Sequence, residues 1–256
     1  MKVRPKKYLG QHFLTDDSIA ARVADSLPEK SAESLVEVGP GMGMLTQFLI
    51  ARNRDLYPIE IDKESVEYLT EHYPALKENI IYGDFLAFNL TDKFPEGMDL
   101  IGNFPYNISA PILFKVLEHR RVVQSVIGMF QKEVAQRIVA SHGNKTYGIL
   151  SVLIQTFYTA ELLFSVGPEK FSPPPNVDSA VLRLQRIPDK SLQCDEAFFF
   201  KTVKTAFGMR RKMLRNSLKP ILGETVLEHP FMTLRPEQLS PKQFEELTLA
   251  LQKALS

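Results

Sequence analysis

The chain has 256 residues, 44% of them hydrophobic and 24% charged, a balance typical of a globular protein with one full domain plus a small one. Its 31 Lys and Arg nearly cancel its 30 Asp and Glu, for a formal net charge of +1. No run of about 18 apolar residues occurs, so no membrane span is predicted. The N-terminus lacks the apolar core of a signal peptide, and the single cysteine, Cys194, excludes a disulfide framework and a multi-cysteine zinc site. We therefore expect a cytoplasmic protein without a metal.

The charges are distributed unevenly along the chain. Residues 1–14 contain four bases and no acid, and residues 201–219 contain seven bases and no acid. The rest of the chain carries 20 bases against 30 acids. A run of charges is usually a solvated helix face, but two long stretches without a single acid favour contacts with phosphates.

Apolar runs alternate with amphipathic stretches up to residue 187, which predicts an α/β fold with a mostly parallel seven-stranded sheet and helices on both faces. The strands are expected at 34–38, 56–60, 80–82, 98–101, 122–130, 157–166 and 179–187. The helices are expected at 17–27, 44–52, 63–72, 110–118 and 132–141, the first capped by Asp16 or Asp17. A short proline-rich turn joins the last two strands, so we expect one of them to run antiparallel.

After Ile187 the pattern changes to helices alone, expected at 196–207, 211–222 and 241–255. The segment 188–190 has the composition of a linker. We therefore place a domain boundary near residue 188. Residues 1–187 form the larger domain, with residues 1–14 as a basic N-terminal arm, and residues 188–256 form a small all-helical domain.

A glycine-rich loop follows the first strand, with the sequence Val36-Glu37-Val38-Gly39-Pro40-Gly41-Met42-Gly43. Glycines let a backbone turn sharply and approach a ligand without a Cβ in the way, although a tight strand–helix turn would need them too. The spacing is G-x-G-x-G, and Met44 stands where the dinucleotide motif requires glycine.

Acidic residues follow the next two strands. Glu60 ends the second strand, where a carboxylate can accept both hydroxyl hydrogens of a ribose. Together with the loop it predicts a nucleoside-containing cofactor, whereas Asp62 is interpreted as a helix cap. Asp84 follows the third strand and could bind an adenine amino group, with Phe85 against the ring; turn chemistry is the alternative.

The segment Asn103-Phe104-Pro105-Tyr106, directly after the fourth strand, is the most specific motif. The nitrogen of an exocyclic adenine amine attacks poorly because its lone pair is delocalised into the ring. Two acceptors, the Asn103 side-chain oxygen and the Phe104 carbonyl, could hold both N–H groups and free the lone pair for methylation. Tyr106 offers a ring on which an extruded base can stack. The alternative is a turn with Tyr106 in the core.

Seven motifs occur in the order of a known family, and they extend over nearly the whole chain. They are Gln11–Leu14, Val36–Gly43, Ile59–Asp62, Gly83-Asp84, Asn103–Ser109, Gln131–Val134 and Phe171–Ser179, followed by Arg210–Leu218 in the helical domain. The chain resembles the small-subunit ribosomal RNA adenine N6,N6-dimethyltransferases, the kasugamycin-sensitivity methylases. The resemblance implies a Rossmann-like class I methyltransferase domain followed by the small helical domain.

The resemblance also implies a cofactor, S-adenosylmethionine, and a direct transfer of its methyl group. The residues implied to line it are His12, Leu14, Gly39, Gly41, Glu60, Asp84, Phe85 and Asn103. Asn103 and Phe104 would orient the target amine, and Tyr106 and Phe171 would sandwich the target base. His12 stands where the family commonly has Asn, and Phe104 where it commonly has Leu. A stiff polyproline turn follows Phe171, but a core position is the alternative for this ring.

The implied partner is the small ribosomal subunit with its 16S rRNA, where two adjacent adenines near the 3′ end would be dimethylated. The residues predicted to contact RNA are Lys6, Lys7, Lys204, Arg210, Arg211, Lys212 and Arg215. Lys204, Arg211, Arg215 and Lys219 are expected to share a helix face. We expect a monomer.

Three alternatives share some of these features. A large-subunit rRNA adenine methylase of the macrolide-resistance type would share every catalytic motif, but the segment 210–218 argues against it. A ribosome-assembly factor without catalysis is disfavoured by the intact motifs. A nicotinamide-dependent dehydrogenase is disfavoured by Met44 and by the segment 103–106.

Overall fold

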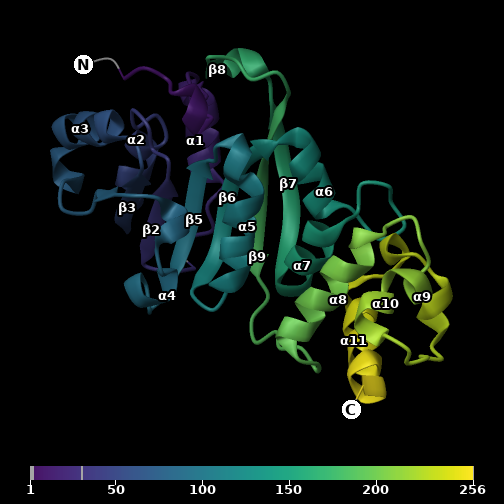
Figure 1. Ribbon diagram of the computed structural model, residues 1–256. Coiled ribbons are helices and arrows are strands. Elements are labelled where there is room, and N and C mark those ends of the chain that lie inside the picture. The colour runs from purple at the N-terminus through teal and green to yellow at the C-terminus, as the bar shows by residue number, and fades with distance from the viewer. Residues whose placement is uncertain (1–2, 30, 256) are drawn as a thin grey trace. The chain divides into compact units, whose positions relative to one another are not determined.

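A computed structural model of the chain describes residues 3–29 and 31–255, so Lys2 of the predicted basic arm lies outside the described residues. Within them, seven strands form one sheet in the order β4-β3-β2-β5-β6-β9-β7 (Figure 1). Their bounds are β2 Ser34–Val38, β3 Asp55–Glu60, β4 Ile81–Tyr82, β5 Met98–Asn103, β6 Val123–Gln131, β7 Tyr158–Val166 and β9 Ser179–Arg186. All seven predicted strands are present, and the α/β prediction is confirmed.

The sheet is mostly parallel. The pairs β2–β3, β2–β5, β3–β4 and β5–β6 are parallel, whereas β9 is antiparallel to β6, as expected for one of the last two strands. The chain proceeds outward from β2 to β3 and β4, and then returns to the other side of β2 to form β5. Where the direction reverses, a crevice opens beyond the carboxyl ends of β2 and β5, and such crevices bind ligands in α/β proteins.

Helices cover the sheet, and its strands are therefore buried on both faces. In β2, for example, every residue from Leu35 to Val38 is buried. The α-helices between residues 17 and 139 are α1 Asp17–Asp25, α2 Thr46–Leu49, α3 Lys63–His72, α4 Leu90–Lys93, α5 Ser109–Glu118 and α6 Lys132–Val139. Asp16 caps α1 by accepting hydrogen bonds from the Ser18 and Ile19 N–H groups at 3.0 and 3.2 Å. One hydrophobic cluster joins α1 and α2 to alternate residues of the strands.

A second, two-stranded sheet was not predicted. β1 Phe13–Leu14 pairs antiparallel with β8 Phe171–Ser172, with Leu14 opposite Phe171. Each strand has two residues, too few for any alternation to show in the sequence. This small sheet joins the first sequence motif to the Phe171 motif, which lies about 160 residues further along the chain.

The chain divides into two compact units, Met1–Ala135 with Glu161–Arg186, and Gln136–Ala160 with Ile187–Ser256. The second unit contains α7 Ile149–Phe157, α8 Glu196–Gly208, α9 Leu214–Ser217, α10 Lys219–Leu222 and α11 Pro241–Leu255. Its core is aromatic: Phe157 lies 6.3 Å from Phe200 between ring centroids, and Phe207 lies 5.8 Å from Phe244. No helix in the described ranges is long and apolar enough to span a membrane.

The second unit differs from the sequence-based expectation in two ways. Residues 136–160 belong to it, although we had placed them in the larger domain, because α7 packs with α8 and α11. The helix expected at 211–222 is two short helices, since α9 ends before Leu218 and Pro220 begins a new helical turn in α10. Arg211 and Lys212 precede α9, so the basic residues 204–219 do not lie along one helix.

Candidate functional site

A pocket of about 930 Å³, its open mouth included, lies at the carboxyl ends of four strands. Val38 ends β2, Glu60 ends β3, Asp84 follows β4, and Asn103 ends β5; all four line the pocket. Residues 8–13 of the N-terminal arm line it as well. The pocket occupies the crevice that the strand order creates, which is the usual place for a ligand in this kind of sheet.

The glycine-rich loop forms the floor of this pocket. Gly39 has φ +68°, and a Cβ built on it would meet no atom within 4 Å, so this backbone faces open space that a ligand can fill. Gly41 has φ +57°, and a Cβ there would lie 2.8 Å from the Phe13 ring. Both positions need glycine, the first for its conformation and the second also because Phe13 packs on the loop.

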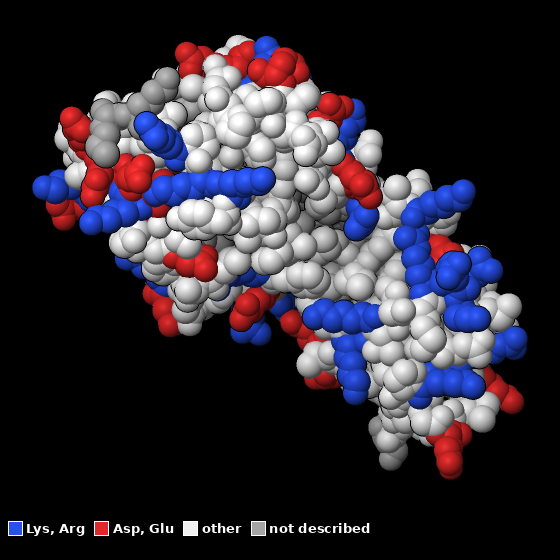
Figure 2. All heavy atoms as spheres, turned by 45° about the horizontal axis from the view of Figure 1, so that its top comes forward, with Lys and Arg blue, Asp and Glu red and all other residues white. Residues whose placement is uncertain are grey.

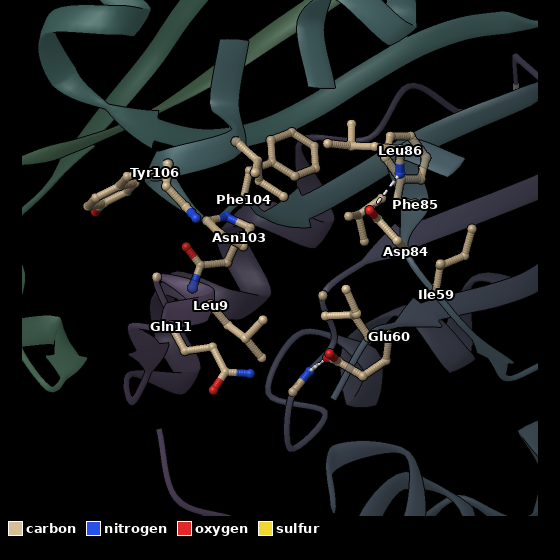
Figure 3. A pocket seen from close by; sticks show the side chains of 18 of the residues that line it. Leu9, Gln11, Ile59, Glu60, Asp84, Phe85, Leu86, Asn103, Phe104 and Tyr106 are labelled. Atoms are coloured by element: carbon tan, nitrogen blue, oxygen red, sulfur yellow. Dashed lines mark hydrogen bonds between the residues drawn. The ribbon is translucent and has the colours of Figure 1, made fainter. Parts of the chain in front are cut away.

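Glu60 is the most buried acidic side chain that lines this pocket, with 3% exposure. One of its oxygens accepts a hydrogen bond from the Gly41 N–H at 3.0 Å (Figure 3). The other accepts one from the Asp62 N–H at 2.8 Å. Burial raises its pKa, and these backbone donors oppose that rise. Each carboxylate oxygen has a second lone pair, so the fixed group can still accept two hydroxyl hydrogens.

Asp84 takes part in the turn that the sequence offered as the alternative, and it lies at the pocket. It caps a short 3-10 helix by accepting a hydrogen bond from the Leu86 N–H at 2.9 Å, and it also lines the pocket. Phe85 beside it is buried with 3% exposure and lines the same end of the pocket (Figure 3). A carboxylate next to an apolar ring suits a base that carries an amino group.

Asn103 and Phe104 enter the pocket from the end of β5. The Asn103 Nδ2 donates a hydrogen bond to the His12 carbonyl at 2.8 Å, which fixes the amide and leaves its Oδ1 as an acceptor. The Phe104 ring is 1% exposed and packs edge-on against Phe130 at 5.1 Å. The Phe104 ring is thus part of the core, while the residue also lines the pocket.

Tyr106 and His12 form a stacked pair at the pocket. Their ring centroids are 5.5 Å apart with planes inclined by 27°. The Tyr106 hydroxyl hydrogen-bonds Ser179, and burial raises its pKa. The His12 Nδ1 hydrogen-bonds the Pro173 carbonyl at 2.7 Å. His12 thus contacts the pocket through its side chain, next to the ring on which a base is expected to stack.

The structure places Phe171 and Leu14 in the hydrophobic core. Phe171 is 4% exposed and Leu14 5%, and both belong to the cluster beneath α1 and α2. Phe171 does not line the described pocket, so the arrangement gives the base-sandwich role no support and corresponds to the core alternative. Leu14 lines an adjacent cavity that shares Phe13, Gly39 and Asn103 with the pocket.

Glu37, which we named only as part of the glycine motif, lines this adjacent cavity. Its side chain is 1% exposed, and its Oε2 accepts a hydrogen bond from the Thr46 hydroxyl at 2.7 Å. Burial raises its pKa to about 8, so the carboxyl keeps its proton at neutral pH. The apolar residues around Glu37 in the motif were the signal for this burial.

The predicted RNA contacts differ in how available their charges are. Lys6 forms ion pairs with Asp62 and with Glu64, the latter at 3.2 Å, and these contacts raise its pKa. Asp62 also caps α3, as interpreted from the sequence. Lys7 is exposed. Lys6 therefore anchors the arm to α3, and Lys7 is the better candidate for a phosphate contact.

In the second unit, basic side chains gather on the surface of the part that contains α8 to α11 (Figure 2). Arg211, Lys212 and Arg215 are exposed, as is Lys204 on α8. Arg210 is half-buried, and its guanidinium donates to the carbonyls of Asn144 and Lys145. Arg210 thus holds a loop of its own unit, which competes with the RNA contact predicted for it.

A family profile described as ribosomal RNA adenine dimethylase matches residues 3–254. The chain belongs to this family. Among curated relatives, ribosomal RNA small subunit methyltransferase A of Parabacteroides distasonis is 52% identical over 255 residues, covering 99% of this chain and 96% of the relative. The protein of the same name from Cytophaga hutchinsonii is 51% identical, covering 96% and 97%.

Two solved structures share the fold over the whole length. A dimethyladenosine transferase from Plasmodium falciparum has a TM-score of 0.80 at 24% identity, covering 95% of this chain and 98% of that one. The 23S rRNA methyltransferase ErmE has a TM-score of 0.66 at 25% identity, covering 95% and 99%. The Rossmann-like methyltransferase fold implied by the sequence is confirmed.

Proposed function

We propose that this enzyme transfers methyl groups from S-adenosylmethionine to N6 of adenines in small-subunit rRNA, dimethylating two adjacent adenines near the 3′ end. The names of the relatives that are about half identical over nearly the whole chain support the small subunit as the substrate. The observation that carries the chemistry is the fixed Asn103 amide, whose Nδ2 is bound by the His12 carbonyl while Oδ1 stays available.

The pocket residues fit S-adenosylmethionine. The open space at Gly39 admits a ligand against the backbone, Glu60 offers two acceptors to a ribose diol, and Asp84 with Phe85 offers an acceptor and an apolar surface to adenine. Asn103 and Gly39 border both cavities, where the methionine end would lie. When bound, the cofactor would supply a methyl group from its sulfonium, and the sulfur would be left as a neutral thioether.

The protein's own contribution is to hold the target amine. Asn103 Oδ1 and the Phe104 carbonyl accept its two N–H groups, so the nitrogen becomes pyramidal and directs its lone pair at the methyl carbon. The nitrogen held in this way would accept the methyl group that the cofactor supplies and would then release a proton to water. Tyr106 supports the extruded base, and proximity and orientation account for most of the rate.

We further propose that the enzyme acts as a monomer in the cytoplasm, without a metal, and binds 16S rRNA through phosphate contacts. The exposed bases of the second unit, Lys204, Arg211, Lys212 and Arg215, together with Lys7 of the arm, supply the charge for these contacts.

The test uses S-adenosylmethionine with a labelled methyl group and small subunits that lack adenine dimethylation. Label should enter two adjacent adenines of the small-subunit RNA, and mapping of the modified bases identifies them. Large subunits serve as the comparison, because an enzyme of the macrolide-resistance type would label those instead. Binding of NAD without binding of S-adenosylmethionine would overturn the proposal.

A further inference from the structure

Among the described residues of the first unit, Tyr8 is the most exposed large apolar side chain, with 77% exposure, and it lines the pocket. An isolated exposed tyrosine is common on protein surfaces and needs no ligand. Tyr8 differs because of its place: it begins the run of residues 8–13, all of which line the pocket that also contains Tyr106.

We propose that Tyr8 is a stacking site for a nucleobase of the RNA strand next to the target adenine. This inference rests on the proposed function, because it needs an RNA strand that enters the pocket at Tyr106. It adds a binding position outside the reacting groups, where a neighbouring nucleotide is held while the target base is extruded.

The turn that carries Tyr8 is held firmly. Tyr8 lies in a 3-10 helix, Lys7–Leu9, and the Lys6 N–H before it donates to the Gln11 side chain at 2.8 Å. The Lys6 ammonium is fixed by Asp62 and Glu64. At the other end, Gly10 lies so close to Asn107 that a Cβ would come within 2.5 Å of its Oδ1.

A ring on a fixed turn suits base stacking. Burying an exposed aromatic ring under a base gains contact area, and the pre-ordered backbone reduces the entropy lost on binding. Stacking tolerates any base, since every base has a π-face. Tyr8 therefore contributes affinity for a single strand without reading its sequence.

The charges around Tyr8 favour a nucleic acid as the occupant. Residues 1–14 contain no acid, and Arg4 and Lys7 are exposed on either side of the anchored Lys6. A cation next to an exposed aromatic ring is the usual arrangement for a single strand, where the cation meets a phosphate and the ring meets the base.

The first experiment compares Tyr8→Ala, Tyr8→Phe and Tyr82→Ala. Tyr82 is the control because it is 61% exposed at the sheet edge and does not line the described pocket. Tyr8→Ala should raise the KM for undermethylated small subunits about tenfold, whereas Tyr82→Ala should leave this KM unchanged. Tyr8→Phe should retain the wild-type KM, since it keeps the ring.

The second experiment uses the absence of tryptophan from the chain. Tyr8→Trp places the chain's one tryptophan at the proposed site, and Tyr82→Trp places it at the control position; excitation at about 295 nm avoids the remaining tyrosines. Single-stranded oligoadenylate RNA should quench the fluorescence of Tyr8→Trp, because stacking on a base quenches indole, and should leave Tyr82→Trp unchanged.

The outcomes separate this inference from the proposed function. A wild-type KM in Tyr8→Ala, or bound oligoadenylate without quenching of Tyr8→Trp, would overturn the stacking site while methyl transfer by the wild type stands. Wild-type protein that transfers no methyl group to small subunits would overturn the proposed function, whatever the fluorescence shows.

Discussion

Glu37 keeps its proton at neutral pH because the carboxyl is buried at the base of the glycine loop, which raises its pKa to about 8. The unfolded chain releases this proton near the ordinary pKa of 4.5, whereas the folded protein retains it until about pH 8. The unfolded state is therefore favoured progressively as pH rises between these values, and the contribution of Glu37 to stability falls over the same interval.

This linkage predicts the behaviour of Glu37→Gln. The amide imitates the protonated carboxyl and does not titrate. The free energy of unfolding of the variant relative to the wild type should therefore rise by about 3 kcal/mol when the pH is raised from 5 to 7. Urea unfolding at both pH values measures the difference. Glu71→Gln, which changes an exposed carboxyl on α3, is the matched control and should give the same difference at both pH values. An equal gain for Glu37→Gln at pH 5 and pH 7 would contradict the raised pKa.

Asn103 should determine the rate of transfer. Asn103→Ala removes the acceptor for the amine and should lower kcat about 100-fold or more while sparing RNA binding. Asn103→Asp keeps an acceptor but cannot donate to the His12 carbonyl, so it should also be slow. Single-turnover methyl transfer and filter binding measure the two effects. Full activity in Asn103→Ala would remove the proposed mechanism.

The positions of single pocket residues were predicted best from the sequence where a residue follows a strand. Glu60, Asp84 and Asn103 meet in the pocket because parallel strands end at the same edge of a sheet. Sequence patterns do not show contacts between distant segments. The burial of Phe171 beside the β1–β8 pair and the ion pairs of Lys6 with Asp62 and Glu64 are therefore known only from the structure.

Among the elements, helices and strands with a clear polar face were predicted closely, and α3 and α11 have the predicted bounds. Helix α7 was missed because it is short and mostly apolar: it has nine residues, and six of them are buried. A short apolar run cannot be told from a buried strand by its sequence pattern alone.

Gly128 on β6 has no side chain and so leaves a notch, which the ring of Phe104 directly after β5 fills. A Cβ at Gly128 would lie 2.3 Å from the Phe104 ring and 2.5 Å from Phe130, so Gly128→Ala should destabilise the protein by about 2 kcal/mol. The smaller side chain of Phe104→Leu should relieve part of this overpacking, so the cost of Gly128→Ala should fall in the Phe104→Leu background. Urea unfolding of the wild type, the two single variants and the double variant measures the coupling. If the two losses in free energy of unfolding were strictly additive, the Phe104 ring would not fill the notch.

For the whole molecule, the net charge of +1 is a sum over parts with different tasks. Acidic residues such as Glu60 and Asp84 line the pocket, and the exposed bases of residues 201–219 lie on the second unit. The sequence identified this separation because it is a property of composition. It could not show which basic side chains bind other parts of the protein. Arg210 does so, but its contact depends on how the loop at Asn144 folds.

The exposed bases should set the salt dependence of RNA binding. Each phosphate that a base neutralises releases counterions, so Arg211→Ala combined with Arg215→Ala should weaken binding and reduce the slope of log K against log salt by about 1.5. Lys63→Ala combined with Lys190→Ala removes the same charge from lysines that pair with Glu67 at 3.8 Å and Glu245 at 2.9 Å, and should leave the slope nearly unchanged. Titration of 16S rRNA at several salt concentrations measures both slopes. Equal slopes for the two double variants would mean that overall charge, not local phosphate contact, governs the affinity.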